Sequence, residues 1–156
     1  MNSQHNDPPL VSIAAARLTD LPALHALLEY CGLPTAGVDS HLDTMLVARD
    51  GQHLVGSAGL ECYGTVALLR SVAVAPHLRG KRLGERLVLA ALDLAKRLGI
   101  DTVYLLTETA QDFFPRFGFT AIERSEVPPA LHASAEWTTA CASTAQAMAK
   151  RLTATP

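Results

Sequence analysis

After a polar start, alternating apolar residues give way to leucines at helical spacing. The alternation over residues 11–15 predicts a strand. Thr19 or Asp20 is placed to cap the helix that follows, and Gly32 is placed to end it. The apolar face of this helix is formed by Leu21, Leu24, Leu27 and Leu28. A loop then leads to a short second helix over residues 39–44.

Two turn signals in the next stretch predict antiparallel strands. Asp50-Gly51 separates apolar segments at 44–49 and 52–61, and a hairpin turn needs the positive φ that glycine adopts at no steric cost. Tyr63-Gly64 marks a further turn before a strand over 65–75. We therefore expect successive strands joined by short hairpins.

The clearest helix covers residues 84–98. Its apolar stripe consists of Leu83, Leu87, Ala91, Leu94 and Leu98, and its polar face of Glu85, Arg86, Asp93, Lys96 and Arg97. Gly99 is placed to end it, and a strand is expected over 101–107. The crossover from the strand at 65–75 through this helix to the next strand predicts a parallel βαβ unit.

The last third of the chain has weaker periodicity. A short helix is expected to begin near Thr109 and to end before Gly118. Residues 119–125 favour an extended segment, 129–136 a weak helix and 140–152 a strand rich in small residues. This order of elements indicates a single α/β domain with a central mixed sheet flanked by helices.

Length and charge narrow the class of partner. At 156 residues the chain has the size of one domain, and a hydrophobic content of 49% is typical of a folded globule. A formal net charge of −2 gives no overall attraction to nucleic acid or to an acidic membrane. We therefore expect a small-molecule partner, with residues 1–9 as a flexible tail.

The cysteines, the histidines and the N-terminal segment bear on location and metal binding. Cys31, Cys62 and Cys141 lack CxxC pairing, which argues against a disulfide framework or a zinc site and favours a reducing cytoplasm. An As(III) site on these thiols is the weaker alternative to buried, inert cysteines. The histidines have no metal-ligand spacing, so no metal is expected. We expect neither an export signal nor a membrane span.

One local stretch departs from the near-neutral average. Residues 79–86 contain four cations and two glycines, between a predicted parallel strand and the start of a helix. Backbone N–H groups of such a turn, the helix dipole and the cations together favour an anion such as pyrophosphate. The spacing matches neither GxGxxG nor the GxxxxGK[ST] P-loop. A merely solvated basic loop is the alternative.

The segment Arg79-Gly80-Lys81-Arg82-Leu83-Gly84, after LRSVAVAP, resembles the coenzyme A pyrophosphate loop of the GNAT N-acetyltransferases, whose pattern is Q/R-x-x-G-x-G/A. Arg82 stands where that family usually has its central glycine, so we expect Arg82 to keep a negative φ. Phe117-Gly118-Phe119 resembles a later element of the family. The resemblance implies one domain of the GNAT, acyl-CoA N-acyltransferase fold over residues 10–152.

Four further segments resemble the small GNAT proteins associated with arsenic resistance operons. They are LPTAGV (33–38), LLRSVAV (68–74), LLTETAQDFFPRFGF (105–119) and VPPALHASAEW (127–137). This second resemblance implies a small anionic acceptor, such as an arsenic- or phosphorus-containing mimic of glutamate.

The family resemblance also implies roles for individual residues, with acetyl-CoA as co-substrate and no metal. The main chain of Val72, Ala73 and Val74 would hold the pantetheine arm and the acetyl carbonyl. The pyrophosphate would be held by Arg79, Gly80, Lys81, Arg82, Leu83, Gly84 and Glu85. The acceptor site would be walled by Tyr30, Leu33, Pro34 and Thr35.

Two charged residues outside the loop allow two interpretations each. Arg70 lies inside an apolar strand, where a guanidinium must find an acceptor or reach solvent. It either anchors a carboxylate, phosphinate or arsinate of the acceptor, or forms a structural ion pair with Glu61. Glu61 is either the base that takes the ammonium proton, directly or through water, or an exposed glutamate at a strand end.

The leaving thiolate needs a proton, and the family pattern often supplies it from a tyrosine. This sequence has Phe114 there, which has no proton to give. Either the thiolate leaves unassisted or through water, or Tyr30, Tyr104 or Thr107 takes over. Thr107 ends the strand that lines the expected cleft, which places it for polar contact with substrate or pantetheine.

The aromatic residues of the last third are expected to be mostly structural. Phe113, Phe114 and Phe117 favour core packing over ligand stacking. Trp137 is expected either over the acceptor pocket or at a dimer contact, and a homodimer through 140–152 is a further expectation.

The predicted function is acetyl-CoA-dependent N-acetylation of a small, anionic amine. Acetylation of another small amine or of a protein amine, and an acetyl-CoA-binding module without turnover, are the alternatives.

Overall fold

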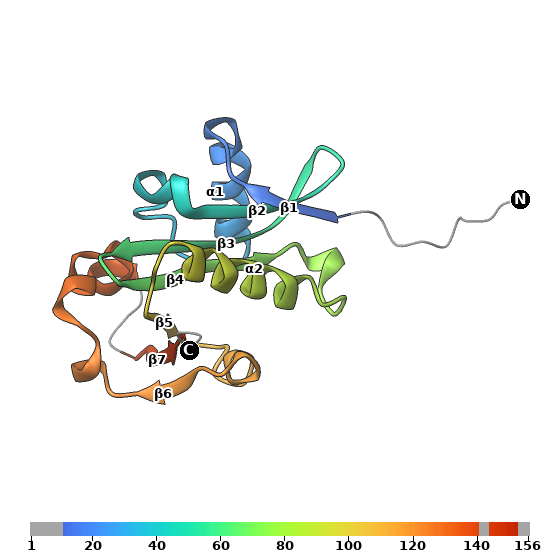
Figure 1. Cartoon of the computed structure of the whole chain (residues 1–156). Coiled ribbons are helices and arrows are strands. Elements are labelled where there is room, and N and C mark those ends of the chain that lie inside the picture. The colour runs from blue at the N-terminus through green and yellow to red at the C-terminus, as the bar shows by residue number, and fades with distance from the viewer. Residues whose placement is uncertain (1–10, 141–143, 153–156) are drawn as a thin grey trace, which may run out of the picture.

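The computed structural model describes residues 11–140 and 144–152. They form a seven-stranded mixed sheet in the order β1-β2-β3-β4-β5-β7-β6. The strands are β1 (Val11–Ala15), β2 (Met45–Asp50), β3 (His53–Tyr63), β4 (Val66–Val74), β5 (Thr102–Thr107), β6 (Thr120–Ile122) and β7 (Gln146–Arg151). The helices α1 (Leu21–Tyr30) and α2 (Leu83–Arg97) lie on opposite sides of the sheet (Figure 1). The expected fold class is confirmed.

The strand pairing agrees with the turn signals in the sequence. Strands β1 to β4 pair antiparallel in succession, and β4 pairs parallel with β5 across α2. Gly51 and Gly64 adopt φ values of 63° and 68° in the two expected hairpin turns. The predicted βαβ unit is therefore confirmed.

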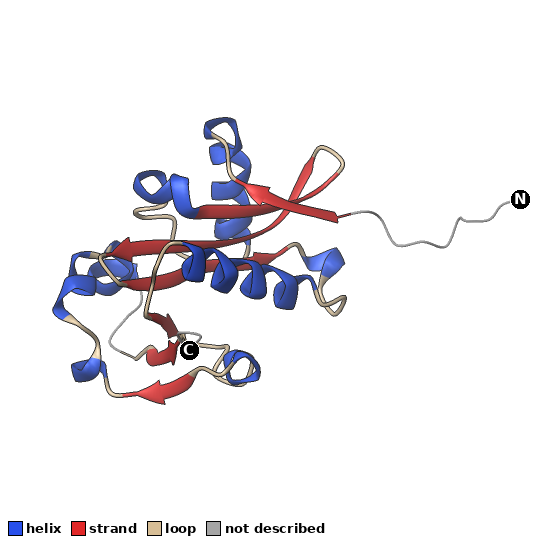
Figure 2. Cartoon of the chain, in the orientation of Figure 1, coloured by secondary structure: helices blue, strands red, loops and turns tan. Residues whose placement is uncertain are grey.

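Short helical turns connect these elements (Figure 2). They are η2 (Leu18–Asp20), η3 (Asp39–Thr44), η4 (Pro76–Leu78), η5 (Phe114–Phe117), η6 (Arg124–Glu126), η7 (Pro129–Ala133) and the π-helical η8 (Glu136–Ala140). The helix expected from Thr109 is reduced to η5. The strand expected over 140–152 is shorter, and Cys141 lies outside the described residues.

Asp20 precedes α1 but does not cap it with its side chain. Its carboxylate instead accepts the Arg17 N–H at 2.7 Å and pairs with both terminal nitrogens of Arg49 at 2.7 and 2.6 Å. The hydrogen bonds from Arg49 lower the pKa of Asp20, against the opposing effect of burial. The carboxylate thus ties β2 to the start of α1. Gly32, with a φ of 71°, ends α1 as expected.

The buried face of α2 differs from the predicted stripe at one end. Its buried residues are Leu83, Leu87, Val88, Ala91, Leu92 and Ala95. Leu98 is 48% exposed because it is the C-cap residue, where the helical direction is already lost.

The segment from β6 to β7 covers part of the sheet. Val127 and Leu131 from this segment pack with Leu68 of β4 and Leu106 of β5 in a second hydrophobic cluster. Strand β7 lies between β5, which pairs with it along its whole length, and β6, which pairs with residues 147–149. An edge-to-edge dimer through the middle of β7 would have to displace β6. The covering segment brings η8 towards the ends of β4 and β5.

Candidate active site

Strands β4 and β5 are paired over only part of their length. Their parallel register joins Val66 to Thr102, Ala67 to Val103 and Leu68 to Tyr104. Beyond this point the strands separate, and a cavity of about 900 Å³ is lined by residues 69–74 of β4 and 105–107 of β5. A cleft therefore opens at the carboxyl end of a parallel strand pair, where α/β sheets bind ligands.

A β-bulge in β4 shapes this cleft. Arg70 is opposite Gly59 and Ala73 is opposite Ser57, so two residues of β4, Ser71 and Val72, face the one residue between them on β3. Ser71 has a φ of 60°, and its carbonyl accepts the Ser57 hydroxyl at 2.6 Å. A bulge redirects side chains and strengthens the local twist. It begins three residues after Leu68, the last residue of β4 that pairs with β5.

The basic loop closes one end of the cavity. Gly80 and Arg82 have φ values of 80° and 65°, and α2 begins at Leu83. The expectation of a negative φ at Arg82 is wrong. The loop needs two left-handed residues to turn its amides towards the start of α2, and one of them is an arginine.

The loop has the donor chemistry for a pyrophosphate. The first N–H groups of α2 have no partner within the helix, and the helix dipole is positive there. A Cβ built at Gly80 would meet no heavy atom within 4 Å, so the outer side of the loop is open. The described residues of the loop thus fit the phosphate end of coenzyme A.

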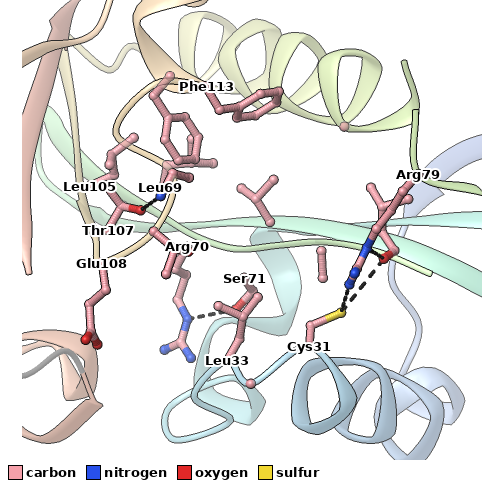
Figure 3. A pocket seen from close by; sticks show the side chains of 18 of the residues that line it. Cys31, Leu33, Leu69, Arg70, Ser71, Arg79, Leu105, Thr107, Glu108 and Phe113 are labelled. Carbon is pink, nitrogen blue, oxygen red and sulfur yellow. Dashed lines mark hydrogen bonds between the residues drawn. The ribbon is translucent and has the colours of Figure 1, made fainter. Parts of the chain in front are cut away.

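Arg79 does not extend freely into the loop. Its Nε donates to the Val74 carbonyl at 3.1 Å, and its Nη2 lies 3.3 Å from Cys31 Sγ (Figure 3). The guanidinium thereby joins the end of β4 to the end of α1. Cys31 lines the cavity, although the sequence analysis did not place it at the coenzyme A site.

Arg70 is at the other end of the cavity and is fully engaged. Its Nη1 donates to Glu61 Oε2 at 2.7 Å, its Nε to Ser71 Oγ at 3.0 Å and its Nη2 to the Pro34 carbonyl at 3.1 Å. A fourth acceptor, Glu136 Oε2, lies 3.6 Å from Nη2. The side chain has no exposed surface. The structural ion pair with Glu61 is therefore confirmed.

Glu61 is buried, so the interpretation as an exposed strand-end glutamate is wrong. It is not among the residues that line the cavity. Its Oε1 accepts the Tyr63 hydroxyl at 2.5 Å. Burial by itself raises the pKa of Glu61, but hydrogen bonds from Tyr63, Arg70 and Ser134 outweigh burial and hold the pKa below its ordinary value. A carboxylate held in this way is a weak proton acceptor.

Glu136 is the main polar residue that the sequence analysis missed. It is 4% exposed, lines the cavity and comes from η8, more than 60 residues after Arg70 in the chain. Its N–H donates to Ser134 Oγ at 3.0 Å, which fixes this turn of the chain. The available signal was a single acidic residue in the otherwise small and apolar stretch 133–137.

Thr107 is the last residue of β5 and lines the same cavity as Arg70 and Glu108, which Figure 3 also labels. It is 8% exposed, and its Oγ1 accepts the Ala110 N–H at 2.9 Å. Because this contact uses the hydroxyl as an acceptor, its hydrogen is available to a partner in the cavity.

The cavity gathers most of the residues expected at the site. Those that line it are Leu33, Pro34, Arg70, Val72, Ala73, Val74, Arg79, Gly80, Arg82, Leu83, Gly84, Glu85 and Thr107. Those that do not are Tyr30, Thr35, Glu61 and Lys81. Tyr30 is 72% exposed, because it lies on the outer side of the last turn of α1.

The aromatic residues of the last third divide between core and cavity wall. Phe114 is buried and meets Phe113 and Phe119 edge to face, at ring distances of 5.1 and 5.8 Å. Phe113 and Phe114 also line the cavity. Trp137 stacks on His132 at 4.3 Å. The guanidinium of Arg124 lies 4.5 Å from the Trp137 ring centre.

Among residues 11–140 and 144–152, no group of three His, Cys, Asp or Glu side chains is arranged to hold a metal ion. The helices of the described chain are too short or too polar to cross a membrane.

The parallel strands β4 and β5 separate next to a basic loop and leave a pantetheine-sized cleft between them. This arrangement defines a GNAT-type α/β domain. A family model described as acetyltransferase (GNAT) domain matches residues 41–121. The chain belongs to this family, whose members use acetyl-CoA.

Curated relatives include proteins named amino-acid acetyltransferase. The protein from Pasteurella multocida is 31% identical over 127 residues, which cover 75% of this chain and 29% of that protein. The protein from Mycobacterium tuberculosis is 31% identical over 128 residues, which cover 74% of this chain and 71% of that protein. The chain spans only 19% and 29% of the length of the Aeromonas salmonicida and Pasteurella relatives.

Solved structures share the fold. N-acetylglutamate synthase from Neisseria gonorrhoeae, in complex with coenzyme A and N-acetyl-glutamate, has a TM-score of 0.79 at 22% identity, covering 95% of this chain and 36% of that one. A Mycobacterium tuberculosis protein in complex with CoA and NLQ has a TM-score of 0.76 at 23% identity, covering 91% and 99%.

Proposed function

We propose that this protein transfers the acetyl group of acetyl-CoA to the primary amine of a small, anionic, amino-acid-like acceptor. The observation that carries the proposal is the single cavity between β4 and β5. It joins the basic loop at one end to Arg70, Glu136 and Thr107 at the other. A cofactor that carries phosphates and a thioester needs such a pairing of an anion cradle with a reaction site.

In this proposal the basic loop binds the pyrophosphate through residues 79–85. The pantetheine arm follows the main chain of Val72, Ala73 and Val74, whose strand lacks its β5 neighbour there. The Val74 carbonyl already accepts from Arg79 Nε at 3.1 Å and from the Cys31 thiol at 3.8 Å, so a hydrogen bond from the pantetheine would replace the longer Cys31 contact. Acetyl-CoA supplies the activated acetyl group when bound.

The acceptor enters at the Arg70 end, between Leu33 and Pro34 on one side and β5 on the other. Arg70 orients the anionic group of the acceptor. Glu61 positions Arg70 and does not act as the base, because it is buried, outside the cavity and has a lowered pKa. The ammonium proton leaves through water in the cleft.

Transfer forms a nitrogen–carbon bond and breaks the carbon–sulfur bond. The proton that the nitrogen loses ends on the sulfur of coenzyme A. The Thr107 hydroxyl donates a hydrogen bond to the developing thiolate and keeps its own proton, since Phe114 has no hydroxyl to offer. Charge stabilisation at the sulfur replaces the tyrosine that family members often use.

The acceptor class is supported by the relatives, which carry the name amino-acid acetyltransferase. Glutamate and its phosphinate and arsinate analogues are the acceptors proposed for this chain. A role in arsenic resistance, a cytoplasmic location and a homodimer stay predictions.

The test is acceptor-dependent release of the coenzyme A thiol. We expect release with L-glutamate or its phosphinate and arsinate analogues, and little with a polyamine or with lysine- and N-terminal peptides. Release only with peptides would identify a protein acetyltransferase. Acetyl-CoA binding without release on any acceptor would identify a binding module and overturn the proposal.

Two matched charge reversals test the loop. Arg82→Glu should raise the KM for acetyl-CoA about tenfold or more, because it places a negative charge at the pyrophosphate. Arg97→Glu, on the exposed end of the same helix, should leave this KM unchanged. Equal effects of both changes would argue against the loop as the phosphate site.

A further inference from the structure

Two carboxylates meet one guanidinium at the acceptor end of the cavity. Arg70 is held tightly by Glu61, at 2.7 Å, and more loosely by Glu136, at 3.6 Å. Glu61 lies outside the cavity, whereas Glu136 and Arg70 line it. The loose partner is therefore the one that faces an incoming ligand.

The burial of Arg70 means that a ligand anion must replace an existing partner. Its side chain is 0% exposed, so a carboxylate reaches the guanidinium only where a contact gives way. The Glu61 and Ser71 contacts are short and buried, and the Pro34 acceptor is a main-chain carbonyl. The contact from Glu136 is the longest, and a side chain rotates more easily than a backbone.

Replacement by a simple anion is unfavourable, because it would take the Arg70 cation away from a nearly buried carboxylate. Glu136 is 4% exposed, and removing one partner of such a pair costs far more than the pair itself contributes. A ligand that brings its own cation with its anion avoids this cost. An α-amino acid carries ammonium and carboxylate on one carbon and so matches an adjacent Arg–Glu pair.

We propose that Glu136 pairs with Arg70 in the absence of acceptor and that an α-amino acid replaces this contact with two new ones. The carboxylate of the amino acid then pairs with Arg70, and its ammonium group pairs with Glu136. Glu136 is thereby a specificity-determining residue that selects α-amino acids, whose ammonium and carboxylate share one carbon, over compounds that carry only one of these groups or carry them far apart. The inference rests on the proposed function, because it takes the acceptor to carry both an amine and an anion.

The geometry also orients the reacting nitrogen. The ammonium held by Glu136 lies next to Arg70, in the cavity that Thr107 also lines. A lysine side chain of a protein has no carboxylate next to its amine and satisfies only half of the pair. Protein amines and polyamines are therefore poor ligands here.

The experiment measures equilibrium binding by calorimetry to the full chain saturated with coenzyme A. The probes are L-glutamate, glutarate, which lacks the ammonium, and 4-aminobutanoate, which lacks the α-carboxylate. We expect L-glutamate to bind at least about tenfold more tightly than either analogue. Equal affinities, tighter binding of glutarate, or no saturable binding of L-glutamate would overturn the inference.

Glu136→Gln separates recognition from a structural role. It should weaken L-glutamate about tenfold and leave glutarate unchanged or tighter, because Arg70 then loses a competing carboxylate. A structural role would weaken both ligands alike and would contradict the inference. Glu123→Gln, an exposed carboxylate in the same covering segment, should change neither affinity.

Binding and turnover fail independently. If the three probes rank in affinity as expected but no acceptor causes release of the coenzyme A thiol, the proposed function is wrong and the recognition site stands. If thiol release occurs with equal efficiency for L-glutamate and 4-aminobutanoate, only the inference of α-amino acid recognition is wrong.

Discussion

Arg70 Nη1 lies 2.7 Å from Glu61 Oε2, and neither side chain has surface in contact with water. This pair links the middle of β4 to β3 just below the cleft. Breaking a buried ion pair by removing one partner leaves an uncompensated charge, which is more harmful than losing both charges.

Glu61→Ala should therefore lower the free energy of unfolding by about 3–5 kcal/mol, as measured by urea unfolding. Asp93→Ala breaks an exposed pair with Arg97, in which both side chains are 67% exposed, and should have little effect. A loss below about 1 kcal/mol for Glu61→Ala would contradict the assignment of a dry, structural pair.

Acid should destabilise the protein through the same carboxylate. The pKa of Glu61 is lowered in the folded state from an ordinary value of 4.5, so its contribution is complete above that pH and is lost as the pH falls towards the folded-state pKa. Glu61→Gln should make the free energy of unfolding fall less steeply below pH 4.5. An unchanged slope would refute the direction of the shift.

Arg82 should accept glycine more readily than a β-branched residue. Its φ of 65° costs an arginine roughly 1 kcal/mol, and glycine removes that cost but adds freedom to the unfolded chain. Arg82→Gly should change stability by less than about 1 kcal/mol, whereas Arg82→Val should be clearly destabilising. Both variants lose the same positive charge. If the valine variant binds acetyl-CoA more weakly than the glycine variant, the difference is therefore due to loop conformation. Equal binding would show that the left-handed turn is dispensable.

Thr107→Val should lower kcat about tenfold or more and leave acetyl-CoA binding unchanged. Thr107→Ser keeps the hydroxyl that accepts the Ala110 N–H and should remain close to wild type. With a thioester whose leaving thiol is more acidic, the valine variant should recover, because that thiolate needs less stabilisation. A defect that is the same for both thioesters would assign Thr107 a structural role.

Gly37 has a φ of 83°, and a Cβ there would lie 3.1 Å from Arg70 Nη1 and 3.3 Å from Ala135 Cβ. Gly37→Ala should raise the KM of the acceptor and lower stability by about 1–3 kcal/mol. Gly51→Ala has the same backbone problem at a φ of 63° with no neighbour within 4 Å, and should lower stability without changing this KM. If both variants changed the KM of the acceptor, the effect of Gly37→Ala could not be assigned to its contact with Arg70.

Local chemistry in the sequence accounts for much of the fold. Asp50-Gly51 and Tyr63-Gly64 predicted the hairpins, and the apolar periodicity before Gly99 predicted α2, because turns and amphipathic helices depend on neighbouring residues. The loop from Arg79 to Gly84 carried the family resemblance for the same reason. Every atom of that anion cradle comes from one continuous stretch.

The acceptor end depended on contacts that no local pattern records. Whether Glu61 was exposed or buried, and whether Arg70 was free, was decided by the packing of β3 against β4 and of the 123–140 segment over them. Glu136 entered the site only through tertiary structure. Most strands, both long helices and the place of the phosphate loop could be predicted from sequence, since these follow from short-range sterics and hydrogen bonding. The tertiary structure decided the charge balance around Arg70, because burial and long-range pairing set the cost of every charge in the cleft.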